Sequence, residues 1–168
     1  FLQKYTHSSP VQNLDQNNLS LCSICMKKLV VIPTFNEKEN IADIIKAVMD
    51  LQQDFHILVV DDSSPDGTAS IVEDLMLVYA GQVFLSVRQV KDGLGKAYIH
   101  GFKWALEHGY DYIFEMDADF SHNPNDLPKL YEACQDADMT IGSRYSKGVN
   151  KDDTEKLAKG DTKYQKLG

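Results

Sequence analysis

Short apolar runs alternate with amphipathic segments through the middle of this 168-residue chain. The apolar runs cover residues 29–32, 56–60, 83–87, 112–116 and 139–141. Runs of this length, rich in β-branched and aromatic residues and ended by polar or proline residues, are typical of buried strands. Strands that alternate with helices predict an α/β fold, with a mainly parallel sheet, right-handed crossovers and helices on both faces.

The segments between these runs carry apolar residues at helical spacing. The expected helices cover residues 41–51, 71–78, 97–107 and 124–134. Asn40 is a suitable N-cap for the first helix, and Pro124 lies near the start of the last, where proline is tolerated. Together, the expected strands and helices alternate along the chain as in a single α/β domain.

Two carboxylates, Asp117 and Asp119, end the apolar run at residues 112–116. Side chains alternate along an extended chain, so both acids point the same way or, where the strand gives way to a loop, reach one point. Two such carboxylates repel each other unless a cation lies between them. Mg²⁺ takes oxygen ligands and commonly uses only one or two protein carboxylates, leaving room for water and phosphates. The pair indicates either a site for Mg²⁺ or Mn²⁺ or a solvated acidic turn.

Polar residues also follow other expected strands. They are residues 33–37, the pair Asp61 and Asp62, and Arg144. In an open parallel sheet, ligands bind outside the carboxyl ends of the strands, near a switch in strand order. We therefore expect these residues to converge with Asp117 and Asp119 on one crevice, which favours the metal site over the acidic turn.

Composition limits the classes of partner. A net charge of −8 and a pI near 5.0 argue against a nucleic-acid surface, which needs a basic footprint. Phosphate ligands remain compatible, because a metal or an arginine can supply local positive charge. No apolar run approaches the ~20 residues of a spanning helix. We expect a cytoplasmic protein, soluble or peripheral, whose membrane contact comes through a lipid substrate, a membrane-bound partner subunit or a missing segment.

The composition changes twice along the chain. Residues 1–25 are polar and lack a sustained period, as in a flexible or extraneous arm, and Met26 is a candidate natural start. Residues 26–150 form the expected domain. Residues 151–168 carry mixed charges and few apolar side chains, so a short helix is compatible and a strand is not expected.

Three smaller features have structural interpretations. Cys22 and Cys25 have metal or redox spacing, but without a second pair they are interpreted as incidental thiols in a reducing compartment. Gly93 and Gly95 lack the third glycine of a dinucleotide fingerprint, so we expect a close-packing loop. His122 is expected on the loop surface.

Five motifs in order carry a family resemblance. They are VIPTFNE (31–37), VDDSSPDGT (60–68), GLGKAYIHG (93–101), MDADFSHNP (116–124) and GSRY (142–145). Together they resemble the inverting GT-A glycosyltransferases, and most closely the dolichol-phosphate (polyprenol-phosphate) mannose synthases. The resemblance covers about residues 28–149 and implies a Rossmann-like GT-A nucleotide-sugar-binding fold.

The resemblance implies a place for the nucleoside of the donor. Pro33, Phe35 and Glu37 match residues that line the nucleotide pocket. Val60 and Asp62 match the strand end that holds the base and the ribose.

The resemblance also implies how the phosphates are held. Asp117, Ala118 and Asp119 match the motif for the metal and the diphosphate, and Arg144 matches an arginine that faces the phosphates. Asp119 and Arg144 are thereby the candidate catalytic residues, with Mg²⁺ or Mn²⁺ as the cofactor.

The reaction implied is transfer of a sugar from a nucleotide sugar, GDP-mannose first, to dolichyl or polyprenyl phosphate, with inversion. A phosphate monoester has a second pKa near ~6 and attacks without an enzymic general base. Members of the family continue well beyond the GSRY motif, whereas residues 151–168 do not resemble that region. The alternative is thus a truncated, non-catalytic module that binds a nucleotide sugar or a partner. A phosphoaspartate receiver would also use paired acids, but it leaves residues 33–37 unexplained.

Overall fold

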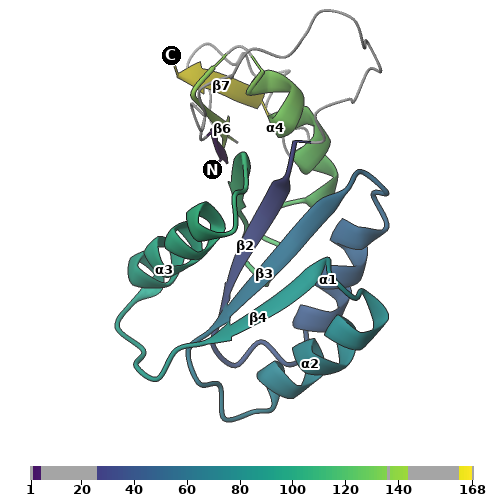
Figure 1. The fold of residues 1–168 in the computed structure, drawn as a ribbon, viewed down its shortest axis with the longest axis vertical. Coiled ribbons are helices and arrows are strands. Elements are labelled where there is room, and N and C mark those ends of the chain that lie inside the picture. Colours follow the sequence, from purple (N-terminus) through teal and green to yellow (C-terminus); the bar gives the residue numbers. More distant parts are fainter. Residues whose placement is uncertain (1, 5–25, 136, 144–162, 168) are drawn as a thin grey trace, which may run out of the picture.

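The computed structural model describes residues 2–4, 26–135, 137–143 and 163–167, which form one sheet with helices on both faces (Figure 1). The strands are β1 (Leu2–Lys4), β2 (Lys28–Thr34), β3 (Phe55–Asp61), β4 (Val83–Val87), β5 (Tyr112–Glu115), β6 (Met139–Ser143) and β7 (Lys163–Leu167). Their spatial order is β4-β3-β2-β5-β1-β6-β7. The pairs among β2, β3, β4 and β5 are parallel, and the pairs that involve β1, β6 and β7 are antiparallel.

The helices cover the parallel part of the sheet from opposite sides. They are α1 (Ile41–Met49), α2 (Thr68–Val78), α3 (Leu94–Glu107) and α4 (Leu127–Ala133), the last preceded by a 3-10 turn at Pro124–Asp126. α1 and α2 lie on one face, and α3 lies on the other (Figure 1). The predicted α/β fold, with a mainly parallel sheet between two layers of helices, is confirmed.

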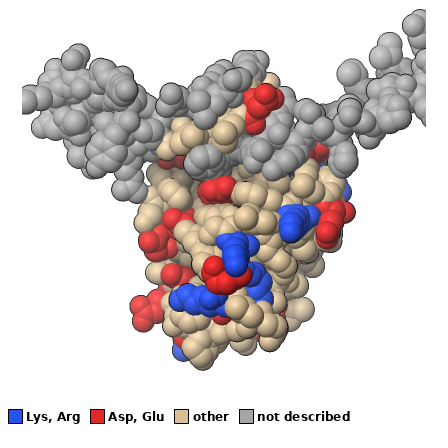
Figure 2. All heavy atoms as spheres, turned by 90° about the vertical axis from the view of Figure 1, so that its left-hand side faces the viewer, with Lys and Arg blue, Asp and Glu red and all other residues tan. Residues whose placement is uncertain are grey.

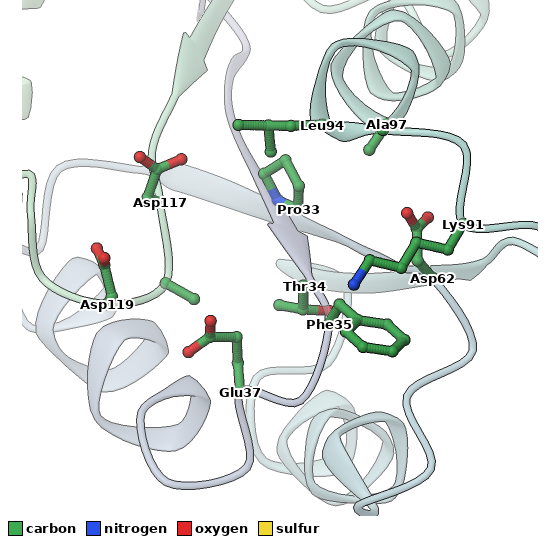
Figure 3. A pocket seen from close by; sticks show the side chains of 12 residues that line it. Pro33, Thr34, Phe35, Glu37, Asp62, Lys91, Leu94, Ala97, Asp117 and Asp119 are labelled. Carbon is green, nitrogen blue, oxygen red and sulfur yellow. The ribbon is translucent and has the colours of Figure 1, made fainter.

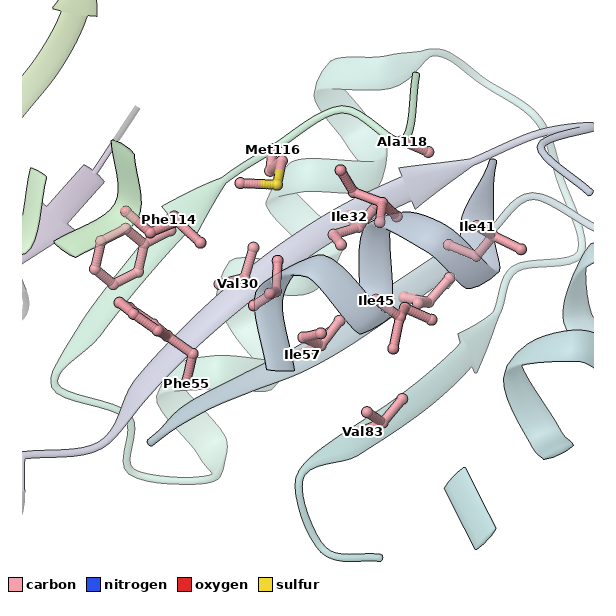
Figure 4. Packing of buried hydrophobic residues seen from close by; sticks show 14 of the residues in the cluster. Val30, Ile32, Ile41, Ile45, Phe55, Ile57, Val83, Phe114, Met116 and Ala118 are labelled. Carbon is pink, nitrogen blue, oxygen red and sulfur yellow. The ribbon is translucent and has the colours of Figure 1, made fainter. Parts of the chain in front are cut away.

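Strand β2 divides the core in two, because alternate side chains point to opposite faces. Val30 and Ile32 pack with the residues of α1 and α2, in the cluster that Figure 4 shows. Leu29 and Val31 pack with residues of α3 in a second cluster. All four side chains have no exposed surface, which confirms the prediction of a strand buried on both faces.

Helix α3 lies on the sheet through small residues. Ala97, Gly101 and Ala105 are its buried positions. A Cβ atom added at Gly101 would lie 2.4 Å from Cγ1 of Val31, so the helix can approach this closely only with glycine there. The same test finds no atom within 4 Å at Gly93 or Gly95. The predicted close-packing loop at Gly93 and Gly95 is therefore wrong, because those residues precede the part of α3 that contacts the sheet.

Two strands lie where none was expected. The prediction that residues 151–168 contain no sheet element is wrong, since β7 pairs with β6 through residues Lys163 to Leu167. The prediction of a flexible arm is also wrong for residues 2–4, which pair with both β5 and β6. β7 is the last strand of the sheet, and β1 lies between β5 and β6. Backbone pairing needs few apolar side chains, so these short polar segments carry no periodic signal in the sequence.

The expected helix boundaries need smaller corrections. The helix expected from residue 97 begins at Leu94, and the one expected from residue 124 starts as a 3-10 turn. Among the described residues, no helix combines the length and apolar character that crossing a bilayer requires.

We expect Gly101→Ala to lower the free energy of unfolding by about 1–3 kcal/mol, because the added methyl group must displace Val31 or lift α3. Urea denaturation measures this change. Gly95→Ala is the matched control on the same helix: its methyl group meets open space, so it should cause no loss and a gain of up to ~1 kcal/mol. Equal stability of the two variants would contradict the close approach of α3.

Candidate active site

A cavity of about 240 Å³ lies at the carboxyl ends of β2, β3 and β5 (Figure 3). Its lining residues are Pro33, Thr34, Phe35, Glu37, Asp62, Lys91, Gly93, Leu94, Ala97, Asp117, Ala118 and Asp119. They come from the loops after three strands and from the start of α3. This is the edge of the sheet at which the sequence predicts convergence.

Most of the predicted site residues meet in this cavity. Seven of them line it: Pro33, Phe35, Glu37, Asp62, Asp117, Ala118 and Asp119. Val60 does not, because its side chain has no exposed surface and packs in the core beneath α3. Arg144 lies outside the residues that the structure describes.

The two acids after β5 each have one oxygen engaged. Oδ1 of Asp117 accepts a hydrogen bond of 2.9 Å from the hydroxyl of Tyr98. Oδ1 of Asp119 accepts one of 2.9 Å from the main-chain N–H of Ser121, and this bond lowers the pKa of Asp119. Both side chains lie on the same side of the cavity in Figure 3. Within the described ranges, no group of three or more His, Cys, Asp or Glu residues could hold a metal ion, so a cation here would rely on two carboxylates.

His122 follows these acids and is half exposed. Its Nδ1 atom accepts a hydrogen bond of 3.2 Å from the main-chain N–H of Asp117 and lies 3.9 Å from the Asp117 carboxylate. The imidazole therefore supports the loop from its surface side.

The adjacent acids at the end of β3 have different environments. Asp61 is fully buried, and its carboxylate accepts hydrogen bonds from the Thr34 hydroxyl (2.9 Å) and from the hydroxyl and N–H of Ser64 (2.6 and 2.8 Å). Asp62 is 8% exposed and faces the cavity. Its Oδ1 atom lies 3.4 Å from Nε of Arg88 but has no hydrogen-bond partner among the described residues. Asp61 is thus a structural acid, whereas Asp62 lines the cavity beside Arg88.

Glu37 is held at the cavity by its own turn. Its Oε2 atom accepts a hydrogen bond of 3.0 Å from Nδ2 of Asn40, and its main-chain N–H donates to the Thr68 hydroxyl at 3.1 Å. Asn40 takes the predicted N-cap position of α1, but its side chain makes no capping bond. The amide orients Glu37 instead.

Several residues in or beside the cavity were not predicted from the sequence. Nζ of Lys91 lies 3.3 Å from the centroid of the Phe35 ring, a cation–π contact at the edge of the cavity (Figure 3). Ion pairs join Arg88 to Asp92, and Asp92 to Lys96. On the α3 side of the molecule, basic and acidic side chains lie interspersed (Figure 2). The loop after β4 ends at the same edge as the others, so the convergence rule could have included Lys91.

Tyr98 was also missed. Its side chain is partly buried, and burial, reinforced by the charge of Asp117, raises the pKa of its hydroxyl well above the usual range. No local pattern marks this residue, because its partner lies in the loop after another strand.

We expect Asp61→Ala to lower the free energy of unfolding by on the order of 3 kcal/mol, because buried donors then lose a charged acceptor.

Asp62→Asn should behave differently. Burial raises the pKa of the Asp62 carboxyl group. The native protein therefore keeps the carboxyl proton of Asp62 to a higher pH than the unfolded chain does. That group's contribution to stability falls as the pH rises from about 4.

Urea denaturation across this pH range measures both effects. Asp62→Asn should remove the fall and leave stability at neutral pH unchanged or higher. A large loss of stability in Asp62→Asn at neutral pH, matching that of Asp61→Ala, would contradict the division between the two acids.

Comparison with known proteins gives matches over most of the chain. Residues 29–167 match the family model described as Glycosyl transferase family 2. A polyprenol monophosphomannose synthase of Mycolicibacterium smegmatis is 47% identical over 123 residues, which are 73% of this chain and 46% of the relative. An undecaprenyl-phosphate mannosyltransferase of Micrococcus luteus is 48% identical over 119 residues (71% and 49%). A dolichol-phosphate mannosyltransferase of Pyrococcus furiosus is 42% identical over 127 residues (73% and 34%).

The chain therefore spans less than half of the length of these curated relatives. Among solved structures, a crystal structure of residues 1–349 of S. aureus TarS is similar, with a TM-score of 0.54 and 25% identity, over 65% of this chain and 32% of that chain. That similarity agrees with the sheet and helix arrangement of the described residues.

Proposed function

Because the chain belongs to glycosyl transferase family 2, we propose that it supplies the donor site for transfer of mannose from GDP-mannose to a polyprenyl or dolichyl phosphate. The transfer is a single inverting displacement assisted by Mg²⁺ or Mn²⁺. One observation carries the proposal: Asp62, Asp117 and Asp119 face one cavity at the carboxyl edge of the sheet. The names of the three curated relatives support mannose as the sugar and a polyprenol-type phosphate as the acceptor.

The residues present fit a hard divalent cation. Asp117 and Asp119 line the cavity together, each with one oxygen already bonded to a protein donor. Mg²⁺ typically takes one or two carboxylates and completes its shell with water and substrate phosphates. When bound, the ion would supply positive charge against the diphosphate leaving group.

The other residues of the chain would bind and orient the reactants. Asp117 and Asp119 would hold the diphosphate end of the donor through the divalent cation at one side of the cavity, and Arg144 is proposed to face the same phosphates. The acceptor phosphate is largely dianionic at neutral pH, since its second pKa is near ~6, so no side chain has to remove a proton. The protein's contribution is alignment of the two reactants and stabilisation of the leaving group.

The nucleoside would bind across the cavity from these acids. An ionised carboxylate only accepts hydrogen bonds, and guanine offers two adjacent donors, N1–H and the exocyclic amine. The Asp62 carboxylate lines the cavity and matches that edge. Lys91, whose ammonium lies over the Phe35 ring, would be a donor for the O6 carbonyl.

We also propose the location and extent of this unit. Residues 26–150 carry the donor-binding domain, whose sheet β1 and β7 complete, and the protein works in the cytoplasm at a membrane surface through its lipid acceptor. A membrane-bound subunit is the proposed protein partner.

Asp119→Asn should weaken Mn²⁺-dependent binding of GDP-mannose by at least about 100-fold, because loss even of outer partners of metal ligands costs 10–100-fold. The amide keeps the shape of the side chain but removes its charge. Isothermal titration calorimetry with and without Mn²⁺ measures the effect. Asp74→Asn, the same substitution at an exposed position of α2, is the control and should change nothing.

Unchanged GDP-mannose affinity in Asp119→Asn would contradict the metal site. Transfer of radiolabelled mannose to a polyprenyl phosphate, dependent on Mn²⁺ and on Asp119, tests the reaction itself. Preferential transfer from a uridine-linked sugar would contradict the choice of donor.

Asp62→Asn should reverse the preference for the base. Xanthine carries a carbonyl where guanine carries the exocyclic amine, and an asparagine amide offers one donor and one acceptor. A hydrogen bond to a charged group contributes about 1.5–3 kcal/mol, so GDP should bind ~10–100-fold more weakly to the variant. Xanthosine diphosphate should bind at least as well as GDP.

Calorimetric titration with GDP, xanthosine diphosphate and UDP measures this preference. Equal loss of affinity for all three nucleotides would show that Asp62 holds the ribose rather than the base.

A further inference from the structure

The hydroxyl of Tyr98 contacts one of the two acids of the proposed metal site but has no part in the reaction described above. We propose that Tyr98 is a positioning residue: its hydroxyl fixes the carboxylate of Asp117 so that one oxygen stays directed to the cation. This inference rests on the proposed function. It assigns a role in the site to a residue of α3, a helix that packs on the sheet and lines the cavity with its first turn.

The contact joins distant parts of the chain. The Tyr98 hydroxyl donates to Oδ1 of Asp117 at 2.9 Å, across 19 residues of sequence. Tyr98 lies on α3, and Asp117 lies in the loop after β5. The Asp117 side chain is 37% exposed, so without this bond it would be free to change rotamer in solvent.

The arrangement parallels that of the second acid. In Asp119, Oδ1 is bonded to the main-chain N–H of Ser121, two residues along the same loop. In Asp117, Oδ1 is bonded to a side chain from another element. Each acid therefore has one oxygen, Oδ1, fixed by a protein donor. Outer partners of this kind orient metal ligands in proteins.

Helix α3 is a firm support for the hydroxyl. The close approach of Gly101 to Val31 fixes the depth of the helix on the sheet. The ring of Tyr98 also stacks on that of Phe102, one turn along, with centroids 6.2 Å apart. Sites supported by helices and strands are held more accurately than sites on loops. The orientation of the Asp117 side chain is thus fixed by a hydroxyl that α3 holds in place.

A different role would be structural, since buried tyrosine hydroxyls usually find a partner. The two roles differ in what the bond changes. If it only satisfies the hydroxyl, its loss affects stability; if it orients Asp117, its loss affects cation binding and spares the nucleoside. The readout must therefore separate metal affinity from nucleoside affinity.

The test is Tyr98→Phe, which keeps the ring and removes one oxygen. Mn²⁺ binding is measured by electron paramagnetic resonance in the presence of GDP, and guanosine binding is measured without metal. We expect the Mn²⁺ affinity to fall by about 10–100-fold, the range for outer partners of metal ligands. Guanosine affinity should stay unchanged, and excess Mn²⁺ should restore GDP binding.

Tyr110→Phe is the matched control. It also removes the hydroxyl of a tyrosine, here a buried one, whose oxygen lies 2.8 Å from Nδ1 of His56 and not at the cavity. It should leave Mn²⁺ affinity unchanged. Equal effects of the two variants on Mn²⁺ affinity would overturn the proposal, as would a loss of guanosine affinity in Tyr98→Phe as large as its loss of Mn²⁺ affinity.

Asp119→Asn separates this inference from the proposed function. If Asp119→Asn abolishes Mn²⁺ binding and Tyr98→Phe leaves it intact, only the role of Tyr98 is wrong. If neither substitution changes Mn²⁺ binding, the metal site itself is wrong, and the positioning role fails with it.

Discussion

Parallel pairing of β2 with both β3 and β5 is the constraint on which the site depends. In this register Thr34 pairs with Asp61, and Val31 pairs with Glu115, so the loops after three strands leave the same edge. The hydrogen bond from Thr34 to Asp61 ties two of these strand ends together. A cavity lined by residues from positions 33 to 119 is thus a consequence of strand direction, and no single loop builds it.

Adjacent side chains at the end of β3 point to opposite sides of the chain, so only one of the two acids there lies at the cavity. At the end of β3, Asp61 points into the protein, where its hydrogen bonds are satisfied, and Asp62 faces the cavity. After β5 the chain turns, and Asp117, Ala118 and Asp119 all line the cavity, while the Ala118 methyl group, 3% exposed, also packs against the core. Ala118, between the two acids, therefore anchors the loop that carries them through a core contact.

The sequence predicts the parallel strands, the helices on both faces and the edge at which the acids meet, because these follow from apolar periodicity and strand direction. It does not predict β7, since a polar strand at an open edge depends on its neighbour's backbone. It also misses Tyr98 and misassigns the close-packed glycine, which is Gly101 instead of Gly93 or Gly95. Both depend on how deeply α3 lies on the sheet, a distance that no local pattern records.

That depth links packing to the site. The residues that bury α3 are small, and the tightest of them, Gly101, lies three positions from Tyr98 on the same rigid helix. A displacement of α3 by a few tenths of an ångström would lengthen the 2.9 Å bond to Asp117 beyond the usual range for a hydroxyl donor. Core packing between Gly101 and Val31 thus sets the geometry of a carboxylate that neither residue touches. Glycine at this position serves the site as well as the core.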